Sequence, residues 1–116
     1  FLYQDILTTI SLPKLDMIVS NPPYVLEKEK ITMNENVLSF EPHMALFVPD
    51  NEPLLYYKKI SYLAAKSLNS NGRLFFEINE KYAKEITCFI SDLGFVNIEL
   101  KKDINEKDRM IKAVWK

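Results

Sequence analysis

The sequence contains few of the residues on which several common kinds of functional site depend. Among its 116 residues are two glycines, one cysteine and one histidine. A single cysteine excludes an internal disulfide and fits a reducing compartment. His43 has no cysteine or histidine at metal-ligand spacing, which argues against a zinc site. Gly72 and Gly94 are too few to build a glycine-rich loop around a cofactor.

Long apolar runs and an excess of charge of one sign are also missing. No apolar stretch approaches the roughly 20 residues that a membrane span needs, so we expect no membrane association. The formal net charge is −1, with 15 basic and 16 acidic residues. These charges are interspersed, whereas a protein that grips phosphates carries a concentrated basic surface. We therefore expect a cytoplasmic protein that makes no direct contact with nucleic acid.

The residues that are present describe an ordinary globular domain with one core, at 47 % hydrophobic and 12 % aromatic content. Periodicity and Pro/Gly breakers predict alternating elements. We expect strands at residues 1–6, 15–20, 73–78, 95–101 and 109–115, helices at 53–68 and 81–93, and a long loop at 25–48. Alternation of this kind predicts an α/β fold with a mostly parallel sheet. The last two strands predict a pair added at one edge, with an antiparallel terminal strand.

The most informative motif is Asn21-Pro22-Pro23-Tyr24, which directly follows the apolar strand predicted at 15–20 and expected to be buried. Ligands of parallel α/β sheets collect beyond the carboxyl ends of the strands. The Asn21 side-chain oxygen and the Pro22 carbonyl can accept both N–H groups of one amide, and Tyr24 offers an aromatic face. Two acceptors on a proline-restricted turn would favour a nitrogen that becomes tetrahedral during reaction. The alternative is a simple turn at a strand exit.

This motif resembles the substrate-amine pocket of amino-methyltransferases, and the wider pattern is similar to the HemK/PrmC family of protein-glutamine N5-methyltransferases. The segments that carry the resemblance are V-S-N-P-P-Y, F-E-P-H-M-A-L at 40–46, N-G-R-L-F-F-E-I, G-F-V-N-I and K-D-I-N-E-K-D-R-M-I-K-A at 102–113. The E-P-x-x-A-L block is the specific part, since N-P-P-Y alone also occurs in nucleic-acid methyltransferases. The resemblance implies that residues 1–116 are the C-terminal part of one class I, Rossmann-like, seven-stranded methyltransferase domain.

The resemblance also implies a reaction: methyl transfer from S-adenosylmethionine to the glutamine amide of the Gly-Gly-Gln motif in peptide chain release factors, without a metal. Residues 21–24 would hold the glutamine, and Asn21 would also lie against the cofactor. Asp5 would accept a hydrogen bond from the adenine ring, and Ile6 would contact that ring. Glu41 would shape the pocket rim and touch the substrate backbone, or else brace its loop. Glu77 could be either structural or functional.

Two features depart from the family pattern. Asn79 stands where the family usually has glycine, and residues 49–53 also lack an expected glycine. We expect both differences to lie away from the amine pocket. Asp108 and Arg109 are expected to form an ion pair that braces the final hairpin.

The resemblance places the glycine-rich cofactor loop and an N-terminal recognition domain upstream of Phe1. We therefore expect the 116 residues alone to be inactive. We also expect the bared edge of the strand at 15–20 to self-associate or to be blocked by residues 1–7.

Two alternative functions stay open. One is an N6-adenine or N2-guanine nucleic-acid methyltransferase, which predicts a basic face, and the other is a non-catalytic binding module that retains the pocket.

Overall fold

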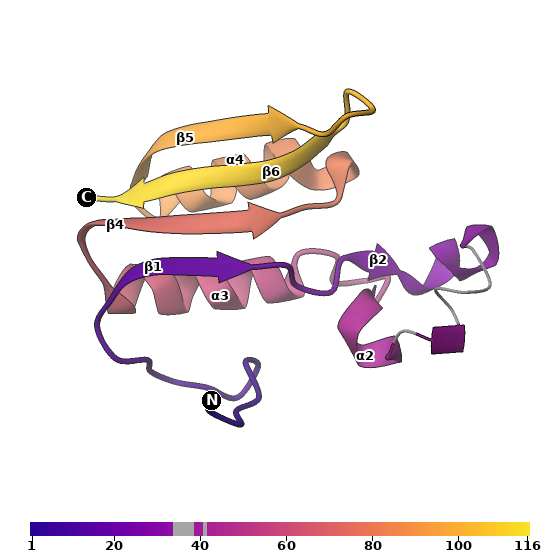
Figure 1. Cartoon of the computed structure of the whole chain (residues 1–116), viewed down its shortest axis with the longest axis horizontal. Helices are drawn as coiled ribbons and strands as arrows, with labels where there is room; N and C mark the ends of the chain where they lie inside the picture. The colour runs from indigo at the N-terminus through magenta and orange to yellow at the C-terminus, as the bar shows by residue number, and fades with distance from the viewer. Residues whose placement is uncertain (34–38, 41) are drawn as a thin grey trace.

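The structure, a computed structural model, describes residues 1–33, 39–40 and 42–116 (Figure 1). The chain forms a four-stranded sheet with a small second pair of strands. In chain order the elements are β1 (Leu15–Ser20), β2 (Val25–Leu26), the 3-10 helix η1 (Glu27–Thr32), α2 (His43–Leu46), β3 (Phe47–Val48), α3 (Leu55–Ser67), β4 (Leu68–Glu77), the 3-10 helix η2 (Glu80–Tyr82), α4 (Ala83–Asp92), β5 (Phe95–Lys102) and β6 (Asp108–Trp115).

The main sheet has the strand order β1-β4-β6-β5. β1 and β4 are parallel, and β6 is antiparallel to both β4 and β5. The predicted α/β class with one antiparallel terminal strand is therefore confirmed. The terminal pair occupies one edge of the sheet, as predicted; within it, β6 lies inside and buries Ile111 and Ala113, whereas most of the outer strand β5 is exposed. The more apolar strand of the hairpin thus takes the interior position.

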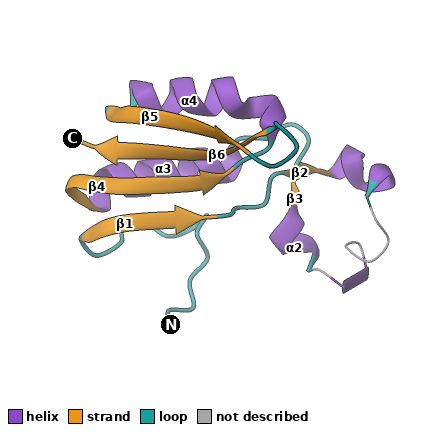
Figure 2. Ribbon diagram, turned by 45° about the horizontal axis from the view of Figure 1, so that its top comes forward, coloured by secondary structure: helices purple, strands orange, loops and turns teal. Residues whose placement is uncertain are grey.

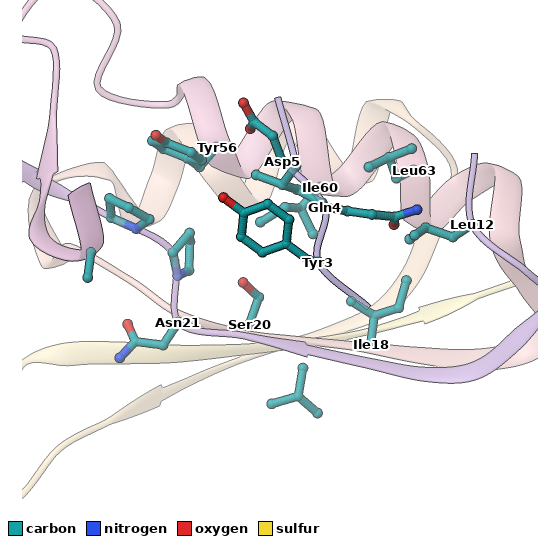
Figure 3. Close-up of a pocket in the computed structure, with 15 residues that line it drawn as sticks. Tyr3, Gln4, Asp5, Leu12, Ile18, Ser20, Asn21, Tyr56, Ile60 and Leu63 are labelled. Carbon is teal, nitrogen blue, oxygen red and sulfur yellow. The ribbon is translucent and has the colours of Figure 1, made fainter. Parts of the chain in front are cut away.

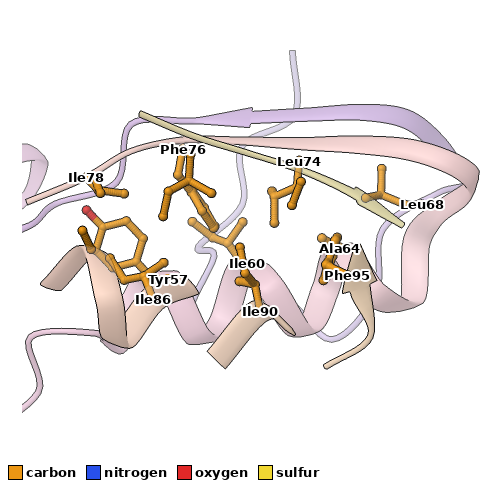
Figure 4. Packing of buried hydrophobic residues seen from close by; sticks show 13 residues of the cluster. Tyr57, Ile60, Ala64, Leu68, Leu74, Phe76, Ile78, Ile86, Ile90 and Phe95 are labelled. Atoms are coloured by element: carbon orange, nitrogen blue, oxygen red, sulfur yellow. The ribbon is translucent and has the colours of Figure 1, made fainter. Parts of the chain in front are cut away.

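Helices α3 and α4 cover the same face of this sheet (Figures 1 and 2). Tyr57, Ile60 and Ala64 recur at 3–4 spacing on α3 and pack toward the sheet (Figure 4). Ile86 and Ile90 do the same on α4. Both predicted helices are confirmed, with slightly shorter bounds. No helix in the described ranges is long and apolar enough to cross a membrane.

The N-terminal third differs most from the prediction. β1 forms as predicted but is not buried, since Met17 is 49 % and Val19 71 % exposed. The reason is that, in the part of the chain the structure describes, β1 pairs only with β4 and helices cover only one of its faces. Residues 1–6 form no strand, so that prediction is wrong. Self-association through the free edge of β1 stays a prediction.

The region predicted as a long loop contains short elements of its own. β2 and β3 pair in parallel, and η1 and α2 flank them. His43 Nε2 lies 2.8 Å from Glu27 Oε1, which links α2 to η1. Glu41 lies outside the described residues, so its predicted place at the pocket rim stays a prediction.

Candidate active site

Residues 21–24, hereafter the NPPY turn, leave the carboxyl end of β1 as predicted. The register places Ser20 opposite Phe76, so the turn passes beside the end of β4. The carboxyl ends of parallel strands meet at one edge of a sheet, where ligands of α/β proteins bind. Pro22 is buried and Asn21 is exposed. The turn is therefore anchored in the fold while its asparagine remains accessible.

Asn21, Pro22 and Pro23 line a cleft of about 690 Å³ between β1, α3 and the N-terminal segment (Figure 3). Asp5 and Ile6 line the same cleft. Asn21 also lines a second cleft, of about 440 Å³, that includes Val19 and Glu77. The tertiary structure thus places residues 21–23 of the NPPY turn on one cleft with Asp5 and Ile6, whereas Tyr24 is not among the residues that line either cleft.

Asp5 is oriented by its own chain. Its Oδ1 accepts the backbone N–H of Leu7 at 2.9 Å, and its carbonyl accepts the backbone N–H of Thr9 at 2.9 Å. The resulting tight turn replaces the predicted strand, because an aspartate that bonds to its own backbone favours a turn over an extended conformation. The same turn places Ile6 beside Asp5 on the cleft.

Tyr24 is tied to the end of β4 at both its phenol and its carbonyl. The phenol donates to Glu77 Oε1 at 2.7 Å, and Asn79 Nδ2 donates to the Tyr24 carbonyl at 3.2 Å. Buried Tyr57 completes the group, because its phenol donates to the Glu77 carbonyl at 3.2 Å and accepts the Asn79 N–H at 3.3 Å. Glu77 therefore holds Tyr24. The prediction that Asn79 lies away from the pocket is wrong.

The predicted ion pair between Asp108 and Arg109 is also wrong. Arg109 Nε instead donates to Asp103 Oδ2 at 3.1 Å, and Asp108 lies 3.9 Å from Lys102 Nζ. Adjacent residues of a strand point to opposite faces, which keeps neighbouring side chains apart. A second Arg109 nitrogen donates to the Ile78 carbonyl at 3.3 Å. Arg109 thus supports the segment that holds Tyr24.

Burial raises the pKa of Tyr24 to about 12, and the hydrogen bond and negative charge of Glu77 act in the same direction. Burial also raises the pKa of Tyr57. Both phenols are therefore neutral at physiological pH. Each can serve as the hydrogen-bond donor that this network requires.

We expect the Tyr24 phenol to ionise near pH 12, instead of near its usual value of about 10. Because its pKa is higher in the folded than in the unfolded state, its contribution to stability is complete below about pH 10 and is lost as the pH rises toward 12. The difference in tyrosinate absorbance between the chain and its Tyr24→Phe variant measures this ionisation. In the Glu77→Gln variant the transition should move to lower pH. A Tyr24 transition near 10 in the folded chain would contradict the assignment.

The sheet order, with an antiparallel strand inserted between β4 and β5, and the NPPY turn at a strand end define the chain as the C-terminal half of a Rossmann-like class I methyltransferase fold. Comparisons with known proteins narrow this class. The chain is 50 % identical over 97 % of its length to a release factor glutamine methyltransferase of Flavobacterium psychrophilum. It is 46 % identical over 84 % of its length to the enzyme of that name from Bacteroides thetaiotaomicron.

A bifunctional methyltransferase of Rickettsia bellii is 37 % identical over 88 % of the chain. No family model matches the chain. The chain spans about two fifths of the length of the first relative and 35 % of the second, and it matches their C-terminal part. The predicted resemblance to protein-glutamine methyltransferases is therefore confirmed. The roles of individual residues stay predictions.

Sequence reasoning missed the parts played by Tyr57 and Asn79. The visible signal for Asn79 was its departure from the glycine usual in the family. For Tyr57 the pattern indicated only that it lies in the helix predicted at 53–68. Its phenol reaches Glu77, 20 residues away, and helical periodicity carries no information about such a contact.

Proposed function

We propose that residues 1–116 are the C-terminal part of a methyltransferase catalytic domain. The complete protein transfers a methyl group from S-adenosylmethionine to the glutamine side chain of the Gly-Gly-Gln motif in peptide chain release factors. The observation that carries this proposal is the accessible Asn21 on an NPPY turn that is held at two points of Tyr24. The 50 % identity to a release factor glutamine methyltransferase supports the choice of substrate.

The geometry suits an amide nitrogen, whose lone pair is delocalised and weakly nucleophilic. Asn21 Oδ1 and the Pro22 carbonyl accept one N–H each and favour a pyramidal over a planar NH₂ group. This preference stabilises the transition state more than the ground state. Pro22 and Pro23 fix the backbone before substrate binds, so little ordering remains to be done. Tyr24 provides the aromatic face on which the planar amide rests.

The cleft fits the cofactor that this reaction requires. Ligand sites of this kind are mostly apolar with a few placed polar groups, and Ile6, Asp5 and Asn21 line one cleft. Asp5 would accept a hydrogen bond from the adenine amine, Ile6 would contact the ring, and Asn21 would lie near the methionine end. When bound, S-adenosylmethionine supplies an electrophilic methyl group on a sulfonium.

No general base and no metal are needed in this scheme. The methylated nitrogen is acidic enough to release its proton to water, and the sulfonium already activates the methyl group. The partner is a release factor, and the place of action is the cytoplasm, where translation ends. Glu41 is proposed to contact the substrate backbone at the pocket rim.

Mass spectrometry tests the proposal directly. The complete protein that contains this chain is incubated with labelled S-adenosylmethionine and a release factor. We expect one methyl group on the glutamine of the Gly-Gly-Gln motif. A release factor with asparagine at that position is the matched control, because it keeps the amide but shortens its reach, and it should stay unlabelled.

Other outcomes of the same experiment separate the alternatives. The 116-residue chain by itself should give no transfer, since it has too few glycines for a cofactor loop. Label on DNA or RNA, with none on glutamine, would favour a nucleic-acid methyltransferase. Failure of the complete protein to bind the cofactor would favour a non-catalytic binding module.

A further inference from the structure

Glu77, at the carboxyl end of β4, and Asn79, two residues further on, hold Tyr24 at its phenol and at its carbonyl. We call this pair of residues the bracket. We propose that Asn79, acting together with Glu77, is a positioning residue that sets the angle at which the NPPY turn presents its two amide acceptors. This inference rests on the function proposed above. It concerns two residues that touch neither the amide nor the cofactor in that scheme.

Asn79 uses its whole side-chain amide. It is only 8 % exposed, its Nδ2 donates to the Tyr24 carbonyl at 3.2 Å, and its Oδ1 accepts the backbone N–H of Lys81 at 3.1 Å. One planar group thus joins the NPPY turn to the start of η2. Aspartate has no donor for the carbonyl and serine is too short to reach both partners, so asparagine is the residue that this bridge requires.

Glu77 holds the other end of the same residue. Its Oε1 accepts the Tyr24 phenol at 2.7 Å, and its own carbonyl accepts the Tyr57 phenol at 3.2 Å. Tyr57 is 1 % exposed. The segment from Glu77 to Asn79 is therefore anchored to the hydrophobic core through Tyr57.

Two anchors on Tyr24 restrict the turn that precedes it. The rings of Pro22 and Pro23 fix their φ angles, which leaves few rotations between Asn21 and Tyr24. Because Glu77 holds the Tyr24 phenol and Asn79 holds the Tyr24 carbonyl, the remaining backbone rotations of the turn are restricted as well. The direction of the Pro22 carbonyl and the position of the Asn21 backbone follow from this constraint, and orientation errors of about 1 Å at reacting groups cost on the order of a hundredfold in rate.

The decisive variant is Asn79→Asp in the complete protein. It keeps the size of the side chain and the acceptor for Lys81, but places a carboxylate oxygen against the Tyr24 carbonyl. Asn105→Asp is the matched control, because it makes the same chemical change at an exposed position of the β5–β6 turn. Thermal unfolding checks that both variants fold.

Two readouts test the proposal. Backbone amide exchange of residues 18–26 should become at least about tenfold faster in Asn79→Asp, with β6 unaffected. The single-turnover rate constant of methyl transfer should fall on the order of a hundredfold. That rate constant does not depend on the folded fraction, so a purely structural defect would leave it unchanged. The Asn105→Asp protein should match the parent in both measurements.

Unchanged backbone amide exchange in Asn79→Asp would refute the hydrogen-bonded bridge from Tyr24 through Asn79 to Lys81. Faster exchange with an unchanged rate constant of methyl transfer would refute the effect of this bridge on catalysis. If Asn79→Asp does not fold, Tyr24→Phe removes the phenol donor and keeps the ring. It should likewise accelerate exchange and slow transfer, and no change in either would refute the bracket. If the parent protein methylates no glutamine, the proposed function fails while the exchange comparison still tests the bridge.

Discussion

Replacing Asn21 with alanine in the complete protein should lower kcat for glutamine methylation by about 10²–10³-fold, equivalent to about 3–4 kcal/mol of transition-state stabilisation. The change removes the one side-chain oxygen that the scheme assigns to the amide, and leaves only the Pro22 carbonyl. Asn21 is exposed, so the free energy of unfolding should change by no more than about 0.5 kcal/mol. Steady-state kinetics and denaturant unfolding measure the two effects separately.

A matched control for this variant is Asn105→Ala. Asn105 is also exposed but lies in the turn between β5 and β6, so its kinetics should equal those of the parent. Asn21→Asp keeps an oxygen acceptor and adds a charge, and we expect it to retain more activity than Asn21→Ala. Parent-like kinetics for Asn21→Ala would remove the role assigned to this residue.

Phe76→Ala should destabilise the fold by about 3–5 kcal/mol. Phe76 is 2 % exposed and meets Tyr57 edge to face, with ring centroids 5.2 Å apart. Deleting the ring opens a cavity beneath β4 and removes the aromatic contact that orients Tyr57. Urea unfolding of the chain and of the variant gives the difference directly.

Tyr62→Ala is the control for Phe76→Ala. Tyr62 also makes an edge-to-face aromatic contact, with Phe89, but is 50 % exposed. Its loss should cost no more than about 1.5 kcal/mol, because the surrounding water fills the space. A similar loss of stability in both variants would show that the core beneath β4 is not the main source of stability.

Much of the fold could be predicted because its signals are local. The apolar stripe of α3, the alternation in β5 and the breakers between elements are all properties of short windows. The place of the NPPY turn also followed from local order, since a turn after a parallel strand must lie at that strand's carboxyl end. Two of the errors, the strand predicted at residues 1–6 and the ion pair predicted between Asp108 and Arg109, arose where side chains bond to the nearby backbone or to a partner across a turn.

By itself, the sequence determined the α/β class, the order of the main elements β1, α3, β4, α4, β5 and β6, and the position of the NPPY turn after β1. The tertiary structure alone decided that Met17 and Val19 of β1 are exposed, that β6 lies between β4 and β5, and that Tyr24 is held by Glu77 and Asn79. Those partners are 53 and 55 residues from Tyr24. Hydrophobic periodicity states which face of an element is buried. Which strands become neighbours, and in what register, depends on how all the faces are buried at once.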